Sequence, residues 1–325
     1  MDIYLTFDYE LFFGEKTGTV EKCILEPTDS LLEIAKKHSI QMTFFVDVGY
    51  LIQLEKWGMK YPLLLNDLDN IKNQIRSIVS LNSKVQLHIH PHWEKAIHNG
   101  DKWLIDTKNC YKIFDFSDDE ITRIVKEYKS YLDDLIGYST TTFRAGGWCI
   151  QPFDRLKSVF KEVGLKKDTS VFVGGQFESK DYYFDFRNAP QKSSYYFEDD
   201  ICVEQKNGSF LEVPISSHRY SPLFYWRLYI LGRLFPTNHK MLGDGIFLSQ
   251  PGRKKSVLTS FTWNHACSDG YYASKLELIL KKLARRDVQE MVVIGHPKSN
   301  THFSVKQLEK FVRKNYKKHS FIAFD

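Results

Sequence analysis

The sequence lacks the features that would identify a membrane-spanning or exported protein. Its most apolar stretch, Pro222 to Phe235, is about half the ~20 residues that a membrane span requires, and it contains Arg227 and Arg233. No basic or apolar export segment precedes the first predicted strand, which begins at Ile3. We therefore expect a cytoplasmic protein without a transmembrane segment.

Cysteine is also scarce, and charge is modest. The five cysteines are odd in number, widely spaced and without a CxxC pair, so they predict reduced thiols, with no disulfide framework and no thiolate zinc site. The formal net charge of +5 is small and scattered, which argues against nucleic acid as a partner. The densest cationic run, from Lys306 to Lys318, lies on a predicted helix whose other face is apolar, so we interpret it as a solvated helix face.

No internal repeat or low-complexity tract interrupts the chain. Hydrophobic residues make up 42% of the sequence and charged residues 26%, which is typical of a globular protein. Aromatic residues are abundant at 15%. Their flat apolar faces are compatible with a carbohydrate site, although most are expected in the core.

Short β-branched or aromatic runs alternate with longer segments of helical period. This alternation predicts an α/β fold with a parallel sheet. Residues 1–325 are expected to form one domain, an irregular (β/α) barrel of about seven parallel strands, with residues 174–251 as an aromatic-rich insertion. The predicted strands are Ile3 to Phe7, Met42 to Val46, Lys84 to His90, Thr140 to Phe143, Asp168 to Val171, Phe210 to Ile215, Val257 to Trp263, Met291 to Ile294 and Phe321 to Phe324.

Local signals mark several helix ends. Ser117 followed by Glu120, and Ser304 followed by Gln307, have the spacing of a capping box and predict helix starts. Gly164 predicts the end of a helix.

Two carboxylates close the first predicted strand. Residues two apart on an extended chain point to the same side, so Asp8 and Glu10 can face one site. An acidic pair at a strand end is more often part of a turn, so this pair gains weight only together with other polar residues.

A histidine cluster follows the third predicted strand. His88 and His90 share one parity, and Pro91 ends the strand, so His92 is expected on the turn just beyond it. Three histidines within five residues exceed what a satisfied core histidine explains. Imidazole and carboxylate groups are suitable ligands for zinc and similar divalent cations.

Six short motifs, in order, resemble those of the polysaccharide deacetylases, the NodB-homology carbohydrate esterases. The resemblance runs from residue 3 to about residue 297 and covers most of the chain except the aromatic insertion. The motifs are Thr6-Phe7-Asp8-Tyr9-Glu10, Thr43-Phe44-Phe45-Val46, His88 with His92, Phe143-Arg144-Ala145-Gly146-Gly147-Trp148, Asp168-Thr169-Ser170 and Ile294-Gly295-His296-Pro297.

The resemblance implies a metal-dependent enzyme. It assigns Asp8 as the general base, and His88 and His92 as two ligands of a divalent metal ion, most commonly zinc. The family's usual second aspartate is replaced here by Tyr9, so Glu10 is expected to supply the carboxylate ligand, as in a variant branch with Asp-x-Glu. His90 has no counterpart and is kept as a reserve ligand or substrate contact.

The remaining motifs imply the other catalytic groups. Arg144 matches the arginine that orients the catalytic carboxylate, and the backbone N–H of Gly147 matches the oxyanion donor, although Gly146 replaces the family's usual proline. His296 matches the general acid. Asp168 matches the acidic residue that holds this histidine.

The substrate implied by the resemblance is an N-acetylated glycan or a glycan precursor, used in the biosynthesis of a surface polysaccharide. Trp93 and Trp148 follow the ligand and arginine motifs and are expected either to stack on a sugar ring or to pack in the core. His90 and His265 are further candidates for substrate contact. The sugar, the acyl group, the metal and the oligomeric state stay open.

Other functions remain compatible with the same residues. Two of Asp8, Glu10 and Asp168 fit a glycoside hydrolase that needs no metal. An inactive carbohydrate-binding barrel and an amide hydrolase of small non-sugar substrates are further alternatives. The stretch Leu223 to Phe235 is interpreted as a buried helix or a subunit contact in preference to a peripheral contact with a membrane.

Overall fold

The structure is a computed structural model that describes residues 1–248 and 252–325. Ser249 to Pro251, at the predicted end of the insertion, lie outside the described residues. The contacts within the chain divide it into two compact units. The first unit comprises residues 1–42 and 215–322, and the second comprises residues 43–214 and 323–325.

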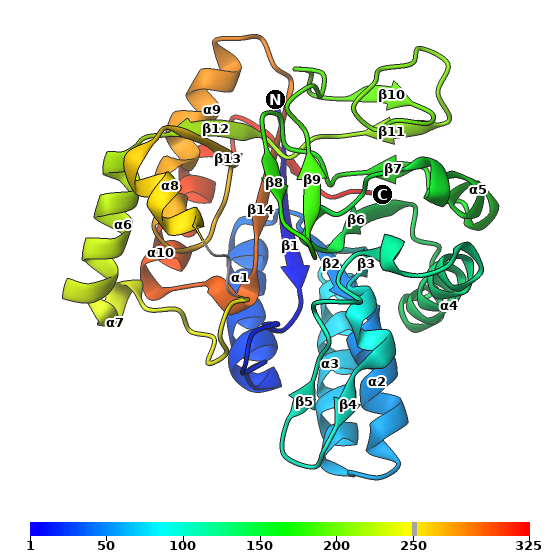
Figure 1. Ribbon diagram of the computed structural model, residues 1–325. Helices are drawn as coiled ribbons and strands as arrows, with labels where there is room; N and C mark the ends of the chain where they lie inside the picture. Colours follow the sequence, from blue (N-terminus) through cyan, green and yellow to red (C-terminus); the bar gives the residue numbers. More distant parts are fainter. Residues whose placement is uncertain (249–251) are drawn as a thin grey trace. The chain divides into compact units, whose positions relative to one another are not determined.

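The sheet of the first unit is built on β1. This strand pairs in parallel with β14 on one side and β15 on the other, and Figure 1 shows β1 and β14 side by side. Both faces of β1 are buried from Leu5 onward, as in parallel sheets covered on each side. The three strands are β1 (Asp2–Tyr9), β14 (Glu290–Gly295) and β15 (Ser320–Ile322).

Helices accompany this sheet. α10 buries Leu308, Phe311 and Val312 and exposes Lys306 and Lys310, which confirms the predicted solvated basic face. Its N-cap is Thr301, with Ser304 at the third helical position, so the capping box lies three residues earlier than predicted. The helices are α1 (Glu26–His38), α6 (Pro222–Leu234), α7 (Pro236–His239), α8 (Arg253–Thr259), α9 (Leu276–Ala284) and α10 (His302–Asn315).

The first unit also holds an antiparallel ribbon of β12 (Ser217–Tyr220) and β13 (Thr262–His265). The predicted strand from Val257 to Trp263 was wrong over its first half, which is helix α8. Val257, the one buried residue of α8, packs against Phe224 and Tyr225 of α6. This tertiary contact outweighs the β-propensity of the segment.

The second unit contains a six-stranded sheet in the order β10-β11-β7-β6-β3-β2. All neighbours pair in parallel except β10 and β11. The register sets His88 beside Arg144 and Asp168 beside Glu212. The strands are β2 (Thr43–Asp47), β3 (Lys84–Ile89), β6 (Thr142–Ala145), β7 (Lys167–Asp168), β10 (Tyr195–Phe197) and β11 (Phe210–Glu212).

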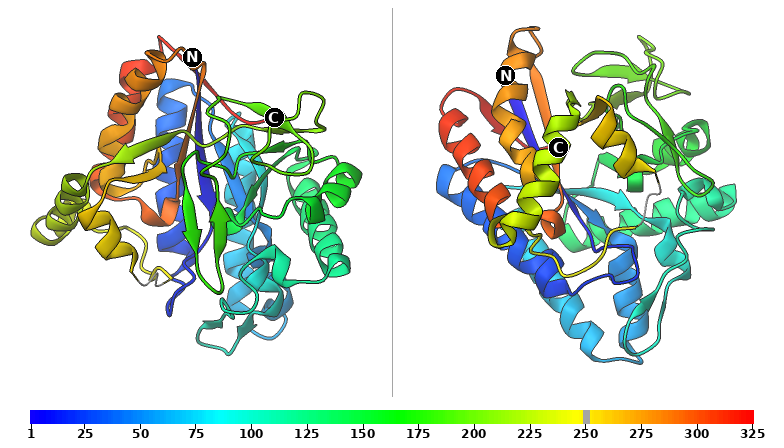
Figure 2. Two further views of the ribbon diagram at one scale, coloured as in Figure 1. Left: turned by 45° about the horizontal axis from the view of Figure 1, so that its top comes forward. Right: turned by 60° about the vertical axis from the view of Figure 1, so that its left-hand side comes forward.

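Four longer helices lie in the second unit, visible in the two views of Figure 2. The capping box of Ser117 and Glu120 is confirmed at the start of α4, and Gly164 ends α5 with a φ of 79°. Two short ribbons pair β4 (Ile97–His98) with β5 (Trp103–Leu104), and β8 (Gln176–Glu178) with β9 (Tyr183–Asp185). The helices are α2 (Val48–Gly58), α3 (Leu63–Ser80), α4 (Asp118–Ile136) and α5 (Asp154–Val163).

The aromatic-rich segment 174–251 contributes to both units. Its strand β11 pairs with β7 and so belongs to the main sheet of the second unit, while β12 and α6 belong to the first. No helix among the described residues combines the length and the apolar character needed to cross a membrane.

Candidate active site

The polar residues of the first unit gather at the carboxyl ends of β1 and β14. Because Phe7 pairs with Gly295, the next residues on the two strands, Asp8 and His296, lie side by side. His296 Nε2 is 3.6 Å from Asp8 Oδ2 and 3.9 Å from Glu10 Oε1. Asp8 and Glu10 are both buried, at 4% and 5% exposure. The pairing of neighbouring parallel strands thus brings two carboxylates and an imidazole together.

His296 is held by Asp269. One carboxylate oxygen of Asp269 lies 2.7 Å from His296 Nδ1, and the other accepts the His296 backbone N–H at 2.8 Å. With Nδ1 bonded to a carboxylate, Nε2 is the ring nitrogen that faces Asp8 and Glu10. Burial lowers the pKa of His296, but the charge and hydrogen bond of Asp269, together with Asp8 and Glu10, outweigh it and raise the pKa above the ordinary value.

The resemblance implies Asp168 at this position beside His296, but the structure has Asp269 there. Asp269 follows β13 by a few residues, and its neighbour Cys267 makes a parallel bridge with Ile294 at the end of β14. The signal for Asp269 in the sequence is weak, since it is only an acidic residue after a predicted strand, in the segment Ser268-Asp269-Gly270.

Lys298 is a further site residue, and no motif of the sequence indicates it. Its Nζ donates to Glu10 Oε1 at 2.8 Å and to the carbonyl of Leu11, and it lies 4.5 Å from the ring centroid of Phe13. The lysine is only 3% exposed. A buried ammonium requires a partner of opposite charge, so Lys298 fixes the position of the Glu10 carboxylate. Its position two residues after His296 was the available signal.

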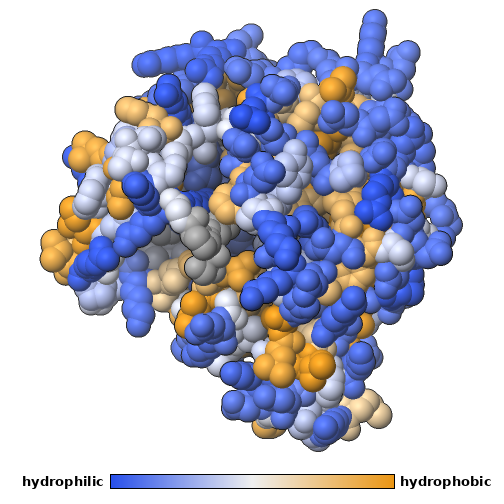
Figure 3. Space-filling view, viewed as in Figure 1, coloured by the Kyte–Doolittle hydropathy of each residue, from blue (hydrophilic) through white to orange (hydrophobic). Residues whose placement is uncertain are grey.

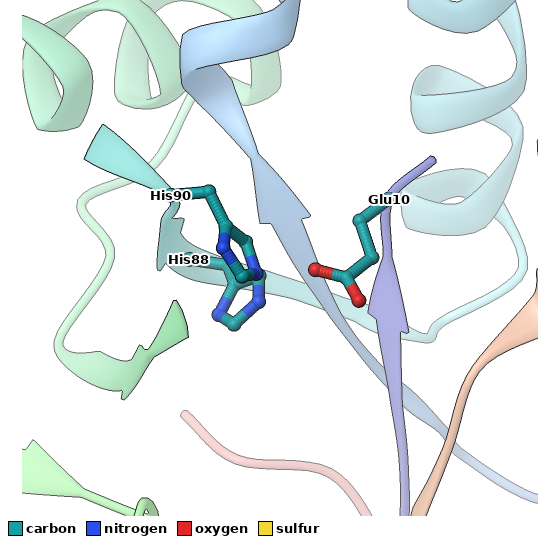
Figure 4. A group of neighbouring side chains, drawn as sticks. All are labelled: Glu10, His88 and His90. Carbon is teal, nitrogen blue, oxygen red and sulfur yellow. The ribbon is translucent and has the colours of Figure 1, made fainter. Parts of the chain in front are cut away.

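The second unit presents three histidines at the carboxyl end of β3. His88 belongs to β3, His90 follows its end and His92 lies in the short helix Pro91–Lys95, and all three are at most 2% exposed. The ring centroids of His88 and His90 are 4.8 Å apart, and those of His90 and His92 are 5.2 Å apart. Figure 4 shows the rings of His88 and His90 close together at this strand end, and it also draws Glu10 at the end of β1.

The tautomer of His88 is set by its neighbouring strand. His88 Nδ1 lies 2.7 Å from the carbonyl oxygen of Arg144, and a carbonyl can only accept, so Nδ1 carries the proton. The lone pair of His88 is therefore on Nε2. A histidine whose second nitrogen donates to a backbone carbonyl has the arrangement usual for metal-ligating imidazoles.

Arg144 is completely buried on β6. Its Nε donates to the carbonyl of Thr169 at 3.0 Å, its Nη2 lies 3.4 Å from Thr169 Oγ1, and the guanidinium carbon is 4.2 Å from the ring centroid of Phe45. These contacts fix the orientation of the guanidinium.

Asp168 forms a buried carboxyl pair with Glu212 on the adjacent strand. Asp168 accepts hydrogen bonds from the backbone N–H and the hydroxyl of Ser170, at 2.7 and 3.1 Å, and Val171 N donates to Glu212 at 3.2 Å. Burial raises the pKa of Asp168 to about 6 despite hydrogen bonds from Glu212 and Ser170 that lower it. Burial, and then the charge of Asp168, raise the pKa of Glu212 well above its usual range. Both shifts favour the retention of a proton on this buried pair in the folded state.

This pair predicts a pH dependence of stability. The folded state keeps a proton on Glu212 that an unfolded chain releases near pH ~4.3, so the free energy of unfolding should decrease as the pH rises above about 4, with a slope of up to about 1.4 kcal/mol per pH unit. Glu212→Gln keeps a donor to Asp168 and should make this decrease smaller, while the raised pKa of Asp168 maintains part of it up to about pH 6. Urea unfolding of both proteins at about pH 5 and about pH 7 measures it. The exposed Glu178→Gln serves as control, and parallel profiles for wild type and Glu212→Gln would contradict the assignment.

Gly147 and Trp148 form a short turn after β6. Gly147 has a φ of 59°, and a Cβ there would lie 2.5 Å from the hydroxyl of Tyr111 and 2.6 Å from Tyr182, so the position requires glycine. Trp148 is partly buried, with its ring 5.5 Å from that of Phe172.

The other predicted substrate contacts differ in their surroundings. Trp93 is fully buried, and its indole N–H donates to Asp47 Oδ2 at 2.6 Å. Trp93 therefore packs in the core, which is one of its two expected roles. His265, at the end of β13 in the first unit, is 7% exposed, and its carbonyl accepts from the Tyr220 hydroxyl at 3.1 Å. His90 lies between His88 and His92.

No protein-family model and no curated protein matches the sequence. Among solved structures, a putative polysaccharide deacetylase from Mycobacterium smegmatis is 14% identical, with a TM-score of 0.52 over 99% of this chain and 86% of that chain. A structure titled Puue allantoinase is 12% identical, with a TM-score of 0.52 over 99% and 87%. A GH57 branching enzyme from Thermococcus kodakaraensis is 9% identical, with the same TM-score over 99% and 69%. These similarities confirm the predicted α/β barrel fold of the deacetylase type.

Proposed function

We propose that the protein is a metal-dependent hydrolase that removes an N-acyl group, most commonly acetyl, from an amino sugar. The observation that carries the proposal is that each unit collects its polar residues at the carboxyl ends of parallel strands. One unit holds two carboxylates beside a histidine, and the other holds three histidines beside an arginine. Active sites of α/β folds form at such strand ends.

We propose that Glu10, His88 and a second imidazole bind one divalent cation, and zinc fits this set of nitrogen and oxygen donors. All of these side chains are buried. The tautomer of His88 supports a role as a ligand, because its Nε2 carries the lone pair. For the second imidazole, the spacing of the resembled motif favours His92, and the close ring contact with His88 favours His90.

A cation bound there would supply an activated water at neutral pH and would polarise the acyl carbonyl. Asp8 would act as the base that accepts a proton from the attacking water. His296 donates a proton from Nε2 to the amine as the C–N bond breaks. The distance of 3.6 Å between Asp8 Oδ2 and His296 Nε2 supports this pair of roles, because both groups could then reach one amide group.

The other residues position these groups. Asp269 keeps a proton on Nδ1 of His296 and favours the charged form that an acid requires. The backbone N–H of Gly147 is the proposed donor to the developing oxyanion, with Arg144 as the residue that orients the catalytic carboxylate. We propose only a structural role for Asp168, on strand β7 beside the strand that carries Arg144.

We further propose that the substrate is an N-acetylated glycan or glycan precursor in surface polysaccharide biosynthesis, that the enzyme is cytoplasmic, and that residues 1–325 act as one catalytic domain. Trp148 is the aromatic candidate for contact with a sugar ring, and His265 lies at a strand end where it can contact substrate.

Product analysis tests the proposed reaction. Oligosaccharides of N-acetylglucosamine incubated with the protein should yield acetate and free amine in equal amounts, without new reducing ends. New reducing ends would identify a glycoside hydrolase. Binding without either product, or hydrolysis restricted to small non-sugar amides, would also contradict the proposal.

Lys298→Met tests how the Glu10 carboxylate is held. The variant keeps the length of the side chain but removes the ammonium that contacts Glu10 Oε1, so we expect metal affinity to fall by about 10–100-fold, the usual effect of losing a group that orients a ligand. Competition with a chromogenic chelator measures the affinity. Lys281→Met, which changes an exposed lysine of α9, is the control. Equal affinity in Lys298→Met and wild type would exclude this role.

A further inference from the structure

The outer face of α6 consists of large hydrophobic residues and arginines. The helix buries Phe224 and Tyr225 against Val257 and Tyr220, and it packs beside α8. In the right-hand view of Figure 2 it lies toward the viewer. The exposed positions of α6 are Leu223, Trp226, Arg227, Ile230, Arg233 and Leu234.

The exposed hydrophobic side chains form one stripe. Leu223, Trp226, Ile230 and Leu234 recur every three or four residues, so they share one side of the helix. Their exposures are 60%, 50%, 46% and 67%, and Phe235, just past the helix, is 55% exposed. Figure 3 shows hydrophobic residues along the edge where α6 lies in Figure 1. Contiguous exposed apolar surface of this kind marks an interaction site.

The charged residues of α6 and of the sequence on either side of it are almost all basic. Arg227 and Arg233 flank it, and residues 213–268 of the sequence contain seven lysines and arginines but a single acidic residue, Asp244. Asp244 is engaged elsewhere, by Lys16 at 3.2 Å and by the backbone of Thr19 at 2.8 Å. A partner for this face must therefore be both apolar and anionic.

We propose that the outer face of α6 docks on an anionic lipid surface, with the stripe in the acyl boundary and the arginines at the headgroups. An interfacial helix requires an apolar side, flanking cations and an aromatic residue near the headgroups, and Trp226 supplies the last. A second copy of the chain fits less well, because a symmetric contact would oppose the arginines of both copies without an acidic residue on the face. This inference does not depend on the proposed reaction.

Cosedimentation with vesicles tests the proposal. The full chain should bind phosphatidylcholine vesicles that contain phosphatidylglycerol, bind pure phosphatidylcholine far less, and dissociate as the salt concentration rises. Trp226→Glu with Leu234→Glu should abolish binding. Leu278→Glu, a change at a 42% exposed leucine of α9, should leave it intact. Circular dichroism verifies that each variant is folded.

The contribution of charge has its own matched pair of variants. Arg227→Gln with Arg233→Gln should weaken binding by about 25-fold, at roughly fivefold for each cation near an anionic surface. Lys306→Gln with Lys310→Gln removes the same charge from the basic face of α10, which carries no apolar stripe, and should change binding by less than about twofold. Equal effects of the two pairs would overturn the proposal.

Two other results would also overturn it. One is a wild-type protein that does not bind anionic vesicles. The other is a concentration-dependent dimer that Trp226→Glu dissociates, since this would assign the face to a second copy of the chain. Sedimentation velocity of wild type and Trp226→Glu detects such a dimer.

Discussion

His88→Ala is expected to yield a folded protein that holds no stoichiometric divalent cation and has no measurable turnover. The reason is that His88 is the imidazole whose tautomer is fixed for ligation, by the contact of its Nδ1 with the carbonyl of Arg144. Removing one of three protein ligands leaves too few donors for a catalytic zinc site. Elemental analysis of purified protein, together with acetate release, measures both effects.

The same measurement identifies the second imidazole. If His92 is the ligand, His92→Ala loses metal as His88→Ala does, and His90→Ala keeps it. The reverse result assigns His90. His98→Ala, which changes a buried histidine in the β4–β5 ribbon outside the cluster, is the control and should retain metal and activity. Full metal occupancy in His88→Ala would show that the proposed ligand set is wrong.

Asp8→Asn is expected to retain the metal and to lower kcat by about 10²–10⁴-fold, the usual contribution of a general base. The amide occupies the same space as the carboxylate but accepts no proton. His296→Ala should have an effect of similar size, because the amine then leaves without its proton. Metal analysis and steady-state kinetics on one preparation separate this loss from loss of the cation.

Asp269→Asn tests whether Asp269 positions His296 for catalysis or only supports the fold. The amide removes the negative charge that raises the pKa of His296, so the alkaline limb of the kcat profile should move to lower pH. Asp168→Asn, which affects the acidic residue first assigned to this histidine, should leave that limb in place. A shift in Asp168→Asn but not in Asp269→Asn would contradict the contact seen in the structure.

The sequence predicted the parts of the fold that depend on local pattern. The strands around Leu5 and Phe44 are nearly continuous apolar runs, which are typical of buried parallel strands, and the strand around Leu87 alternates apolar and polar residues. The capping box at Ser117 and the glycine at 164 predict a helix start and a helix end from local chemistry, and both lie at helix ends in the structure.

Other features depended on contacts between distant segments. Asp269 and Lys298 reach His296 and Glu10 through the pairing of β1 with β14 and the bridge of Cys267 to Ile294, which no local spacing reveals. Val257 was predicted on a strand because it is β-branched, but its packing against α6 makes it helical.

The partner of Asp168 shows the same limit. Glu212 lies beside it only because β11 pairs with β7, two segments separated by about forty residues of sequence whose pattern suggested an insertion. A buried carboxyl pair has no signature in one sequence, since each residue alone is an ordinary acidic residue at a strand end.

Metal removal and restoration test the central claim most directly. Protein treated with a chelator and freed of it by gel filtration should release no acetate from N-acetylglucosamine oligosaccharides, and one equivalent of Zn²⁺ should restore the rate. Undiminished acetate release by protein shown to be metal-free by elemental analysis would contradict the account.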